Sequence, residues 1–144
     1  MTRSLIRTVA VAATLLAVAL GPALAADARP TKPKTAAGIE AVNRGDYKTA
    51  FELFRAQAAK GDPEAQFELG MLFALGKGVE RNLVTAFMWA EIAARQNEPY
   101  ADFIRDEVAA NLTASEIGIA RGNANDWMRA NGYAAQLPAM KAGQ

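Results

Sequence analysis

The sequence predicts an all-α fold, a short right-handed α-solenoid of about three antiparallel helix pairs. Residues 62–97 show apolar residues at helical spacing on both sides of a glycine-containing turn. The dipeptide Ala50–Phe51 recurs 36 positions later as Ala86–Phe87, and self-similarity at a fixed period indicates stacked repeats. The segments before and after 62–97 resemble copies or caps of that central unit.

The first helix of the central unit is predicted to begin at Asp62, an N-cap candidate. Pro63 suits the first helical position, and Glu64 suits the positive end of the helix dipole. An apolar face then follows at helical spacing, formed by Ala65, Leu69, Leu72 and Phe73.

A second helix is predicted from Asn82, which can cap it, to about Gln96. Gly76 and Gly78 break the helical pattern between the two helices. The second helix is apolar on nearly every side, so it must be packed between neighbours. Gly70 costs the first helix about 1 kcal/mol relative to Ala, and this cost predicts that another helix approaches closely there.

The central unit combines a Leu-Gly pair, a G-x-G-V turn and small residues around a Trp. The motif residues are Ala65, Leu69, Gly70, Phe73, Gly76, Gly78, Val79, Ala86, Trp89, Ala93 and Ala94. Together they resemble the Sel1-like repeat, a bacterial and eukaryotic relative of the tetratricopeptide repeat. The close match covers residues 62–97, and the flanks match more loosely. The resemblance implies a concave groove, lined by the first helix of each pair, that receives a partner's peptide or helix.

The chain begins with the features of an export signal. Arg3 and Arg7 precede an apolar run at 9–20, and Ala23–Leu24–Ala25 forms a small-x-small cleavage site. The run is shorter than the about 20 apolar residues that a membrane span needs, although an uncleaved anchor is the alternative. We expect a signal peptide at 1–25, cleavage after Ala25 or Ala26, and a periplasmic or secreted protein without a membrane span.

Composition excludes several classes of function. Removing residues 1–25 takes away two of the 16 basic residues and none of the 15 acidic ones, which leaves a net charge of −1. A near-neutral chain without a basic stripe argues against nucleic acid as a partner. The sequence has no His and no Cys, so it lacks the commonest general base and transition-metal ligands. We therefore expect no metal, no cofactor and no catalysis.

The flanking units are predicted as follows. Residues 26–34 read as a flexible leader, and residues 35–61 as a degenerate first repeat that turns at 44–47 and ends at Gly61. Residues 98–132 read as a capping helix pair. Its first helix should start at Pro99 with Asn97 as cap, place Tyr100 on an apolar stripe and end near Asn111. Its second should start at the capping box Thr113–Glu116, and residues 133–144 should form a loose tail.

Some residues have both a chemical and a structural interpretation. Glu64 and Glu68 lie one helical turn apart, and a pair of carboxylates can hydrolyse glycosides, but both also suit a solvated helix end. Trp89 and Trp127 are interpreted as partly buried packing residues rather than ligand platforms.

Two pairs of opposite charges fit ordinary helical spacing. Glu91 with Arg95 and Glu52 with Arg55 are three or four positions apart, which suits ion pairs on a solvated helix face.

The predicted partner-binding residues lie on the first helices of two units. They are Glu64, Phe67, Met71 and Ala74 in the central unit and Ile39 and Val42 in the first. An adaptable Met beside an aromatic suits a binding surface. Alternatively, Leu137 and Met140 of the tail cover Phe67 and Met71.

These observations lead to one preferred function. We expect an exported adaptor that binds a protein or peptide partner and carries no catalysis. One alternative is a protein that binds or cleaves envelope glycans such as peptidoglycan. Another is a homodimer formed through the same groove.

Overall fold

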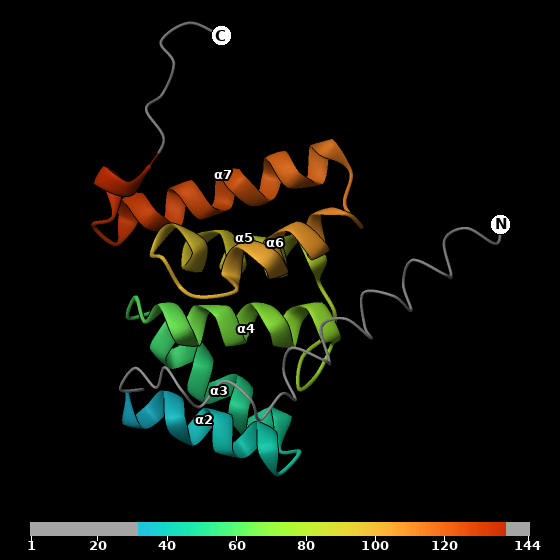
Figure 1. The fold of residues 1–144 in the computed structure, drawn as a ribbon, viewed down its shortest axis with the longest axis vertical. Helices are drawn as coiled ribbons and strands as arrows, with labels where there is room; N and C mark the ends of the chain where they lie inside the picture. Colours follow the sequence, from blue (N-terminus) through green and yellow to red (C-terminus); the bar gives the residue numbers. More distant parts are fainter. Residues whose placement is uncertain (1–31, 138–144) are drawn as a thin grey trace, which may run out of the picture.

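The computed structural model describes residues 32–137, so the predicted signal peptide and Met140 lie outside the described residues. Within them all regular secondary structure is helical, and the helices form a stack that runs from α2 at one end to α7 at the other (Figure 1). The α-helices are α2 (Pro33–Asn43), α3 (Tyr47–Ala58), α4 (Pro63–Leu75), α5 (Leu83–Arg95), α6 (Ala101–Ala109) and α7 (Ala114–Ala130), followed by the 3-10 turn η2 (Ala134–Gln136). The predicted all-α solenoid is confirmed.

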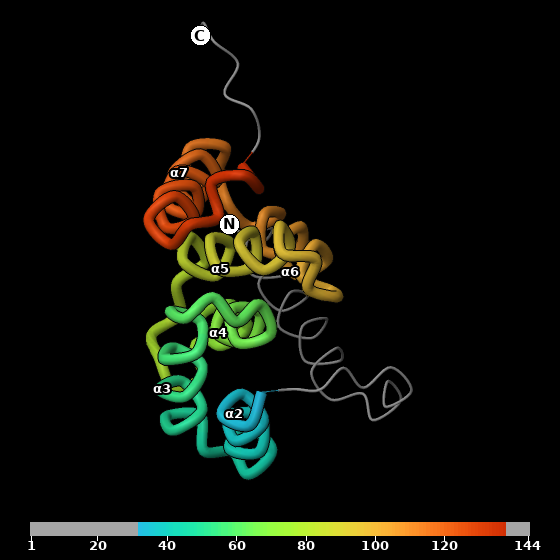
Figure 2. The backbone as a smooth tube through the Cα atoms, turned by 90° about the vertical axis from the view of Figure 1, so that its left-hand side faces the viewer, coloured from blue at the N-terminus to red at the C-terminus, as the bar shows by residue number. Residues whose placement is uncertain are grey.

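Neighbouring helices pack in sequence order over the first two units. α2 packs on α3, α3 on α4, and α4 on α5, while α3 and α7 lie on one side of the stack and α2 and α6 on the other (Figure 2). The third unit differs from the predicted helix pair, because α6 and α7 each pack on α5 more extensively than on one another. α5 is therefore the central helix, as its nearly continuous apolar surface requires.

Two predicted helix starts are confirmed by their caps. The Asn82 side chain accepts a hydrogen bond from the backbone N–H of Thr85 at 2.9 Å and begins α5. At the start of α7, Thr113 and Glu116 exchange hydrogen bonds and form the predicted capping box. Both caps use residues three positions apart, which is why the local sequence could show them.

Asp62 is the N-cap residue of α4, as predicted, but its carboxylate has another partner. α4 begins at Pro63 as expected, but the Asp62 side chain makes no capping hydrogen bond. Its buried carboxylate instead accepts a hydrogen bond from the Thr35 hydroxyl at 2.9 Å, with the Lys32 ammonium 3.6 Å away. Asp62 therefore ties the start of α2 to the start of α4.

The start of α6 also differs from the prediction. α6 begins at Ala101 rather than at Pro99, and it ends before Asn111. Asn97 and Tyr100 have φ angles of 60° and 65°, which a continuing helix excludes. Tyr100 is the N-cap, and it is 50% exposed instead of lying on an apolar stripe.

The predicted leader and tail are shorter than expected. α2 already begins at Pro33, so the last two residues of the 26–34 segment are helical. Tyr133 stacks on Trp127 with ring centroids 5.8 Å apart, and Leu137 packs in the same cluster. A Cβ at Gly61 would overlap the Tyr133 hydroxyl, so the chain after α7 reaches back to the α3–α4 turn. Leu137 thus packs with the cluster of Ile92, Ala124 and Met128 rather than with Phe67 and Met71.

Three apolar clusters form the core. One centres on α4 and α5 and reaches α6 and α7, one joins α2 and α3 to α4, and one joins α5 to α7. Phe73 packs against the first two clusters, and Trp89 packs against the second and third. The apolar faces of successive units are therefore continuous, as stacked repeats require.

Candidate functional site

A pocket of about 480 Å³ opens between the C-terminal end of α2 and the length of α4. Its apolar wall is formed by Val42 of α2, Tyr47 of α3, and Met71, Leu72 and Leu75 of α4. Its charged residues are Arg44, Glu68 and Lys77. Because the α4 residues are three or four positions apart, a single helix face supplies Glu68 and the apolar residues beside it.

The turn after α4 shapes one end of the pocket. Gly78 has a φ of 71°, and a Cβ there would overlap the Tyr47 backbone carbonyl. This close approach places Lys77 over Tyr47, with its ammonium 4.6 Å from the ring centroid and donating to the phenol oxygen at 3.1 Å. The G-x-G turn of the repeat motif therefore fixes a cation at this end of the pocket.

Glu68 supplies the acidic end. Its side chain is partly buried, and burial, followed by repulsion from Glu64 and Glu98, raises the pKa of its carboxyl to about 7. Arg44 does not approach as its counter-ion, because the Arg44 guanidinium pairs with Glu40 at 2.8 Å. The pocket thus combines an apolar wall with a carboxyl group that titrates near neutral pH.

The structure separates the predicted partner-binding residues. Val42 and Met71 line the pocket, although Met71 is only 4% exposed. Ile39 and Phe67 are partly buried against core clusters, and Ala74 is buried. Their role in binding, together with that of the partly buried Glu64, stays a prediction.

Eight of the ten residues that line the pocket were not among the predicted partner-binding residues. They are Asn43, Arg44, Gly45, Tyr47, Glu68, Leu72, Leu75 and Lys77. The spacing of 68, 71, 72 and 75 on one helix was available as a signal for the α4 face. The contribution of Tyr47 was not, because it depends on contact with the turn 30 positions later.

The repeat-motif residues mostly build the interior. Ala65, Leu69, Gly70, Ala86 and Ala93 are buried, Phe73, Trp89 and Ala94 are partly buried, and Gly76 and Gly78 adopt positive φ in the turn. A Cβ at Gly70 would lie 3.2 Å from the Ala86 carbonyl oxygen, which confirms the predicted close approach of α5. Trp89 meets Trp127 edge to face at 5.6 Å, and both are partly buried as predicted.

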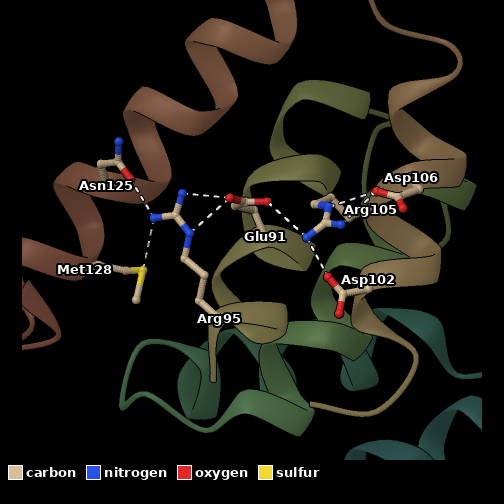
Figure 3. Close-up of polar contacts among 7 residues, drawn as sticks. All are labelled: Glu91, Arg95, Asp102, Arg105, Asp106, Asn125 and Met128. Carbon is tan, nitrogen blue, oxygen red and sulfur yellow. Dashed lines mark hydrogen bonds and ion pairs between the residues drawn. The ribbon is translucent and has the colours of Figure 1, made fainter. Parts of the chain in front are cut away.

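A second polar cluster lies between α5, α6 and α7 (Figure 3). Glu91 accepts two hydrogen bonds from Arg95, at 3.0 and 2.7 Å, and lies 3.5 Å from Arg105 on its other side. The Glu91 and Arg95 side chains are only 9% and 14% exposed, so the predicted solvated pair is in fact buried. Neighbouring helices cover it, which the helical spacing alone could not show.

The outer members of this cluster satisfy the two arginines. Arg105 pairs with Asp102 at 2.6 Å and Asp106 at 2.9 Å, while Arg95 donates to the Asn125 side-chain oxygen at 2.6 Å. Figure 3 shows Glu91 between the two guanidinium groups, with Asn125 and Met128 on α7. This ion-pair cluster holds α5, α6 and α7 together.

Residues 32–137 contain neither a membrane-spanning helix nor a metal-binding cluster of carboxylates. None of the helices there has the length and apolar content needed to cross a membrane. The same residues contain no group of three or more carboxylates arranged to hold a metal ion.

The fold and pocket define a class of protein. Stacked helical units that bury their apolar faces on neighbours make the chain an α-solenoid repeat protein. Residues 37–62 and 63–98 match the family model described as the Sel1 repeat. The chain therefore contains two Sel1 repeats, as its motif predicted.

Two known proteins are similar to parts of the chain. The chitin synthase regulator SKT5 of Saccharomyces cerevisiae is 38% identical over 64 residues, which cover 44% of this chain and 9% of the yeast protein. A protective antigen of uropathogenic Escherichia coli strains, whose crystal structure displays an SLR fold, aligns with a TM-score of 0.66 at 24% identity. That alignment covers 77% of this chain and 26% of the antigen's chain, so this chain spans only a small part of either relative.

These comparisons bear on function at a general level. Sel1-like repeat proteins are generally protein-interaction modules, and the fold is typically a scaffold without catalysis. The similarity to the E. coli antigen concerns the fold alone.

Proposed function

We propose that the protein is an exported interaction module that binds a protein partner at the pocket between α2 and α4 and has no catalytic activity. The observation that carries this proposal is the pocket itself. It lies between the first helices of two Sel1 repeats, the helices that line the concave groove in this kind of stack.

The dimensions and lining of the pocket support a binding role. A volume of about 480 Å³ falls within the roughly 300–1,000 Å³ of ligand pockets, which are mostly apolar with a few polar groups. The pocket has this composition, with an apolar wall from three helices and charged groups at its ends. A short peptide segment could place one or two side chains in such a space.

Site-specific photo-crosslinking in the native host tests the binding face. A benzoylphenylalanine at Asn43, which is exposed and lines the pocket, should yield an adduct with a partner protein. The same group at Ile119 of α7, which is 55% exposed, is the control. The substitution Val42→Arg, which fills the pocket, should abolish the Asn43 adduct while circular dichroism remains helical.

Three results would redirect the proposal. Equal adducts at Asn43 and Ile119 would contradict a specific binding face. An adduct of twice the chain mass would indicate a homodimer through the pocket. Absence of any adduct at Asn43 would contradict a role for this pocket in protein binding.

The exported location rests on the signal features of the first 25 residues and has its own test. N-terminal sequencing of the protein from fractionated host cells should read from Ala26 or Asp27, in the periplasm or the medium. A protein that retains Met1 in the cytosol would contradict export.

One observation favours a second candidate function, the cleavage of envelope glycans. A carboxyl group whose pKa is raised to about 7 suits a general acid, and Glu68 has this property within a pocket. Glu64, its predicted carboxylate partner, is not among the residues that line the pocket. Release of soluble fragments from purified peptidoglycan, lost in Glu68→Gln, would establish this function instead.

A further inference from the structure

We propose that the pocket between α2 and α4 receives a Lys or Arg side chain of the partner protein, with Glu68 as its counter-ion. This inference rests on the proposed function and names the chemistry of the partner segment. The stem of the basic side chain lies along the apolar wall, and its cation meets the Glu68 carboxylate.

The charges that line the pocket support this assignment. Both cationic residues that line the pocket have partners within residues 32–137. Arg44 pairs with Glu40, and Lys77 binds Tyr47. The charged groups recorded near Glu68 are instead the carboxylates Glu64 and Glu98. An incoming cation would therefore offset the repulsion that these two carboxylates exert on Glu68.

The wall beside Glu68 suits a long aliphatic stem. Met71, Leu72 and Leu75 continue along the same face of α4, and Val42 faces them from α2. Lys and Arg bury their methylene stems on such surfaces while the charged end keeps polar contacts. A purely apolar side chain would pack against the apolar wall but would leave the Glu68 carboxylate desolvated. An acidic side chain would be repelled by that carboxylate.

The two ends of the pocket also give the bound segment a direction. Arg44 and Lys77 line the end opposite Glu68, where they would repel a cation and attract an acidic residue. A segment with a basic residue at one end and an acidic residue at the other therefore fits in one orientation.

Binding of a cation to Glu68 makes the interaction depend on pH. Glu64 on α4 and Glu98 after α5 act on the Glu68 carboxyl, and Arg44 at the end of α2 and Lys77 after α4 line the same pocket. With a pKa of about 7, roughly a tenth of Glu68 is ionised at pH 6 and nine tenths at pH 8. Affinity for a basic peptide should therefore rise about tenfold between pH 6 and pH 8.

Selection from a phage library of random peptides tests the inference. The protein expressed from the full sequence, its Glu68→Gln and Glu68→Lys variants, and the control Glu52→Gln on exposed α3 surface are each used as bait. The original protein and the control should enrich peptides with Lys or Arg beside apolar residues. Glu68→Gln should lose that enrichment, and Glu68→Lys should enrich acidic peptides.

Affinity measurements complete the test. A selected basic peptide should bind the original protein about tenfold more tightly at pH 8 than at pH 6, and Glu68→Gln should remove this pH dependence. Selected peptides that no longer bind when Val42→Arg fills the pocket, but that are not enriched in Lys or Arg, would overturn this inference while leaving the proposed function intact. If no peptide is selected, or if those selected bind Val42→Arg equally, both would be overturned.

Discussion

At Gly70 the backbones of α4 and α5 are in direct contact, and this gives a test at the scale of one residue. A Cβ there would lie 3.2 Å from the Ala86 carbonyl oxygen and 3.4 Å from the Ala90 amide nitrogen. Backbone atoms cannot move aside as a side chain can, so Gly70→Ala should destabilise the fold despite the better helix propensity of Ala. Gly118 in α7 has open space around it, and Gly118→Ala should stabilise by up to about 1 kcal/mol.

Urea denaturation of the two variants checks this contrast. We expect Gly118→Ala to exceed Gly70→Ala in unfolding free energy by about 2 kcal/mol. Equal stabilities would mean that α5 can shift away from α4 without cost.

Glu68 gives a second prediction, on stability and pH. Its folded-state pKa of about 7 lies above the ordinary 4.5, so the folded state favours the protonated form. The contribution of the Glu68 carboxyl to the free energy of unfolding is fully present below about pH 4.5 and is lost as the pH rises through 7. Glu68→Gln should therefore raise the unfolding free energy by about 1–3 kcal/mol at pH 8 and much less at pH 5. A gain that is the same at both pH values would contradict the raised pKa.

Residue burial was the part that the sequence predicted least well. The Glu91–Arg95 pair was expected on a solvated face, yet α6 and α7 bring Arg105 and Asn125 against it. Asp62 was expected to cap α4, but Thr35, 27 positions earlier, takes its carboxylate. In both cases the decisive partner comes from a distant segment, which local spacing does not reveal.

At the scale of elements, the buried Glu91 determines how α5, α6 and α7 are held together. Replacing it with Gln leaves Arg95, whose side chain is only 14% exposed, without its carboxylate. Breaking a buried ion pair from one side costs about 3–5 kcal/mol, so we expect Glu91→Gln to lower the unfolding free energy by about 3 kcal/mol.

Glu52→Gln is the matched control for this prediction. Glu52 pairs with Arg55 at 2.6 Å, but both side chains are more than half exposed, so its loss should change stability by less than about 1 kcal/mol. Similar losses in thermal or urea unfolding for the two variants would mean that burial adds nothing to the Glu91 cluster.

The start of a helix was predicted correctly where its signal lay within one helical turn. Asn82 and the Thr113–Glu116 box marked the starts of α5 and α7 correctly, because each cap lies within one helical turn. The start of α6 was wrong because Asn97 and Tyr100 adopt positive φ, which ordinary side chains rarely do and which no local pattern indicated.

At the scale of the whole molecule, two aromatic residues link the clusters. Phe73 packs against both the first and the second cluster, and Trp89 packs against both the second and the third. We therefore expect one cooperative unfolding transition, in which far-ultraviolet circular dichroism and Trp fluorescence give the same midpoint. Because Trp89 and Trp127 both pack against the third cluster, Trp fluorescence reports the unfolding of the α5–α7 end of the stack. A fluorescence midpoint below the circular dichroism midpoint would show that this end unfolds separately.

The 36-position repeat explains how much of the architecture could be predicted. It placed α2 to α5 correctly, because both repeats keep the same order of helix, turn and helix. The third unit lacks the Leu-Gly pair that brings two helices together, and α6 and α7 pack mainly on α5 instead. The pocket was predicted only in part, because the contacts of Tyr47 with the later turn complete it.

The contact of Tyr133 with Gly61 has a consequence for the order of folding. The two residues are 72 positions apart, whereas a stack of repeats otherwise forms from contacts between adjacent units. Closing so long a loop carries an entropic cost that is repaid only after the intervening helices have assembled. The contact should therefore form late in folding and slow the completion of a chain whose individual units can assemble quickly.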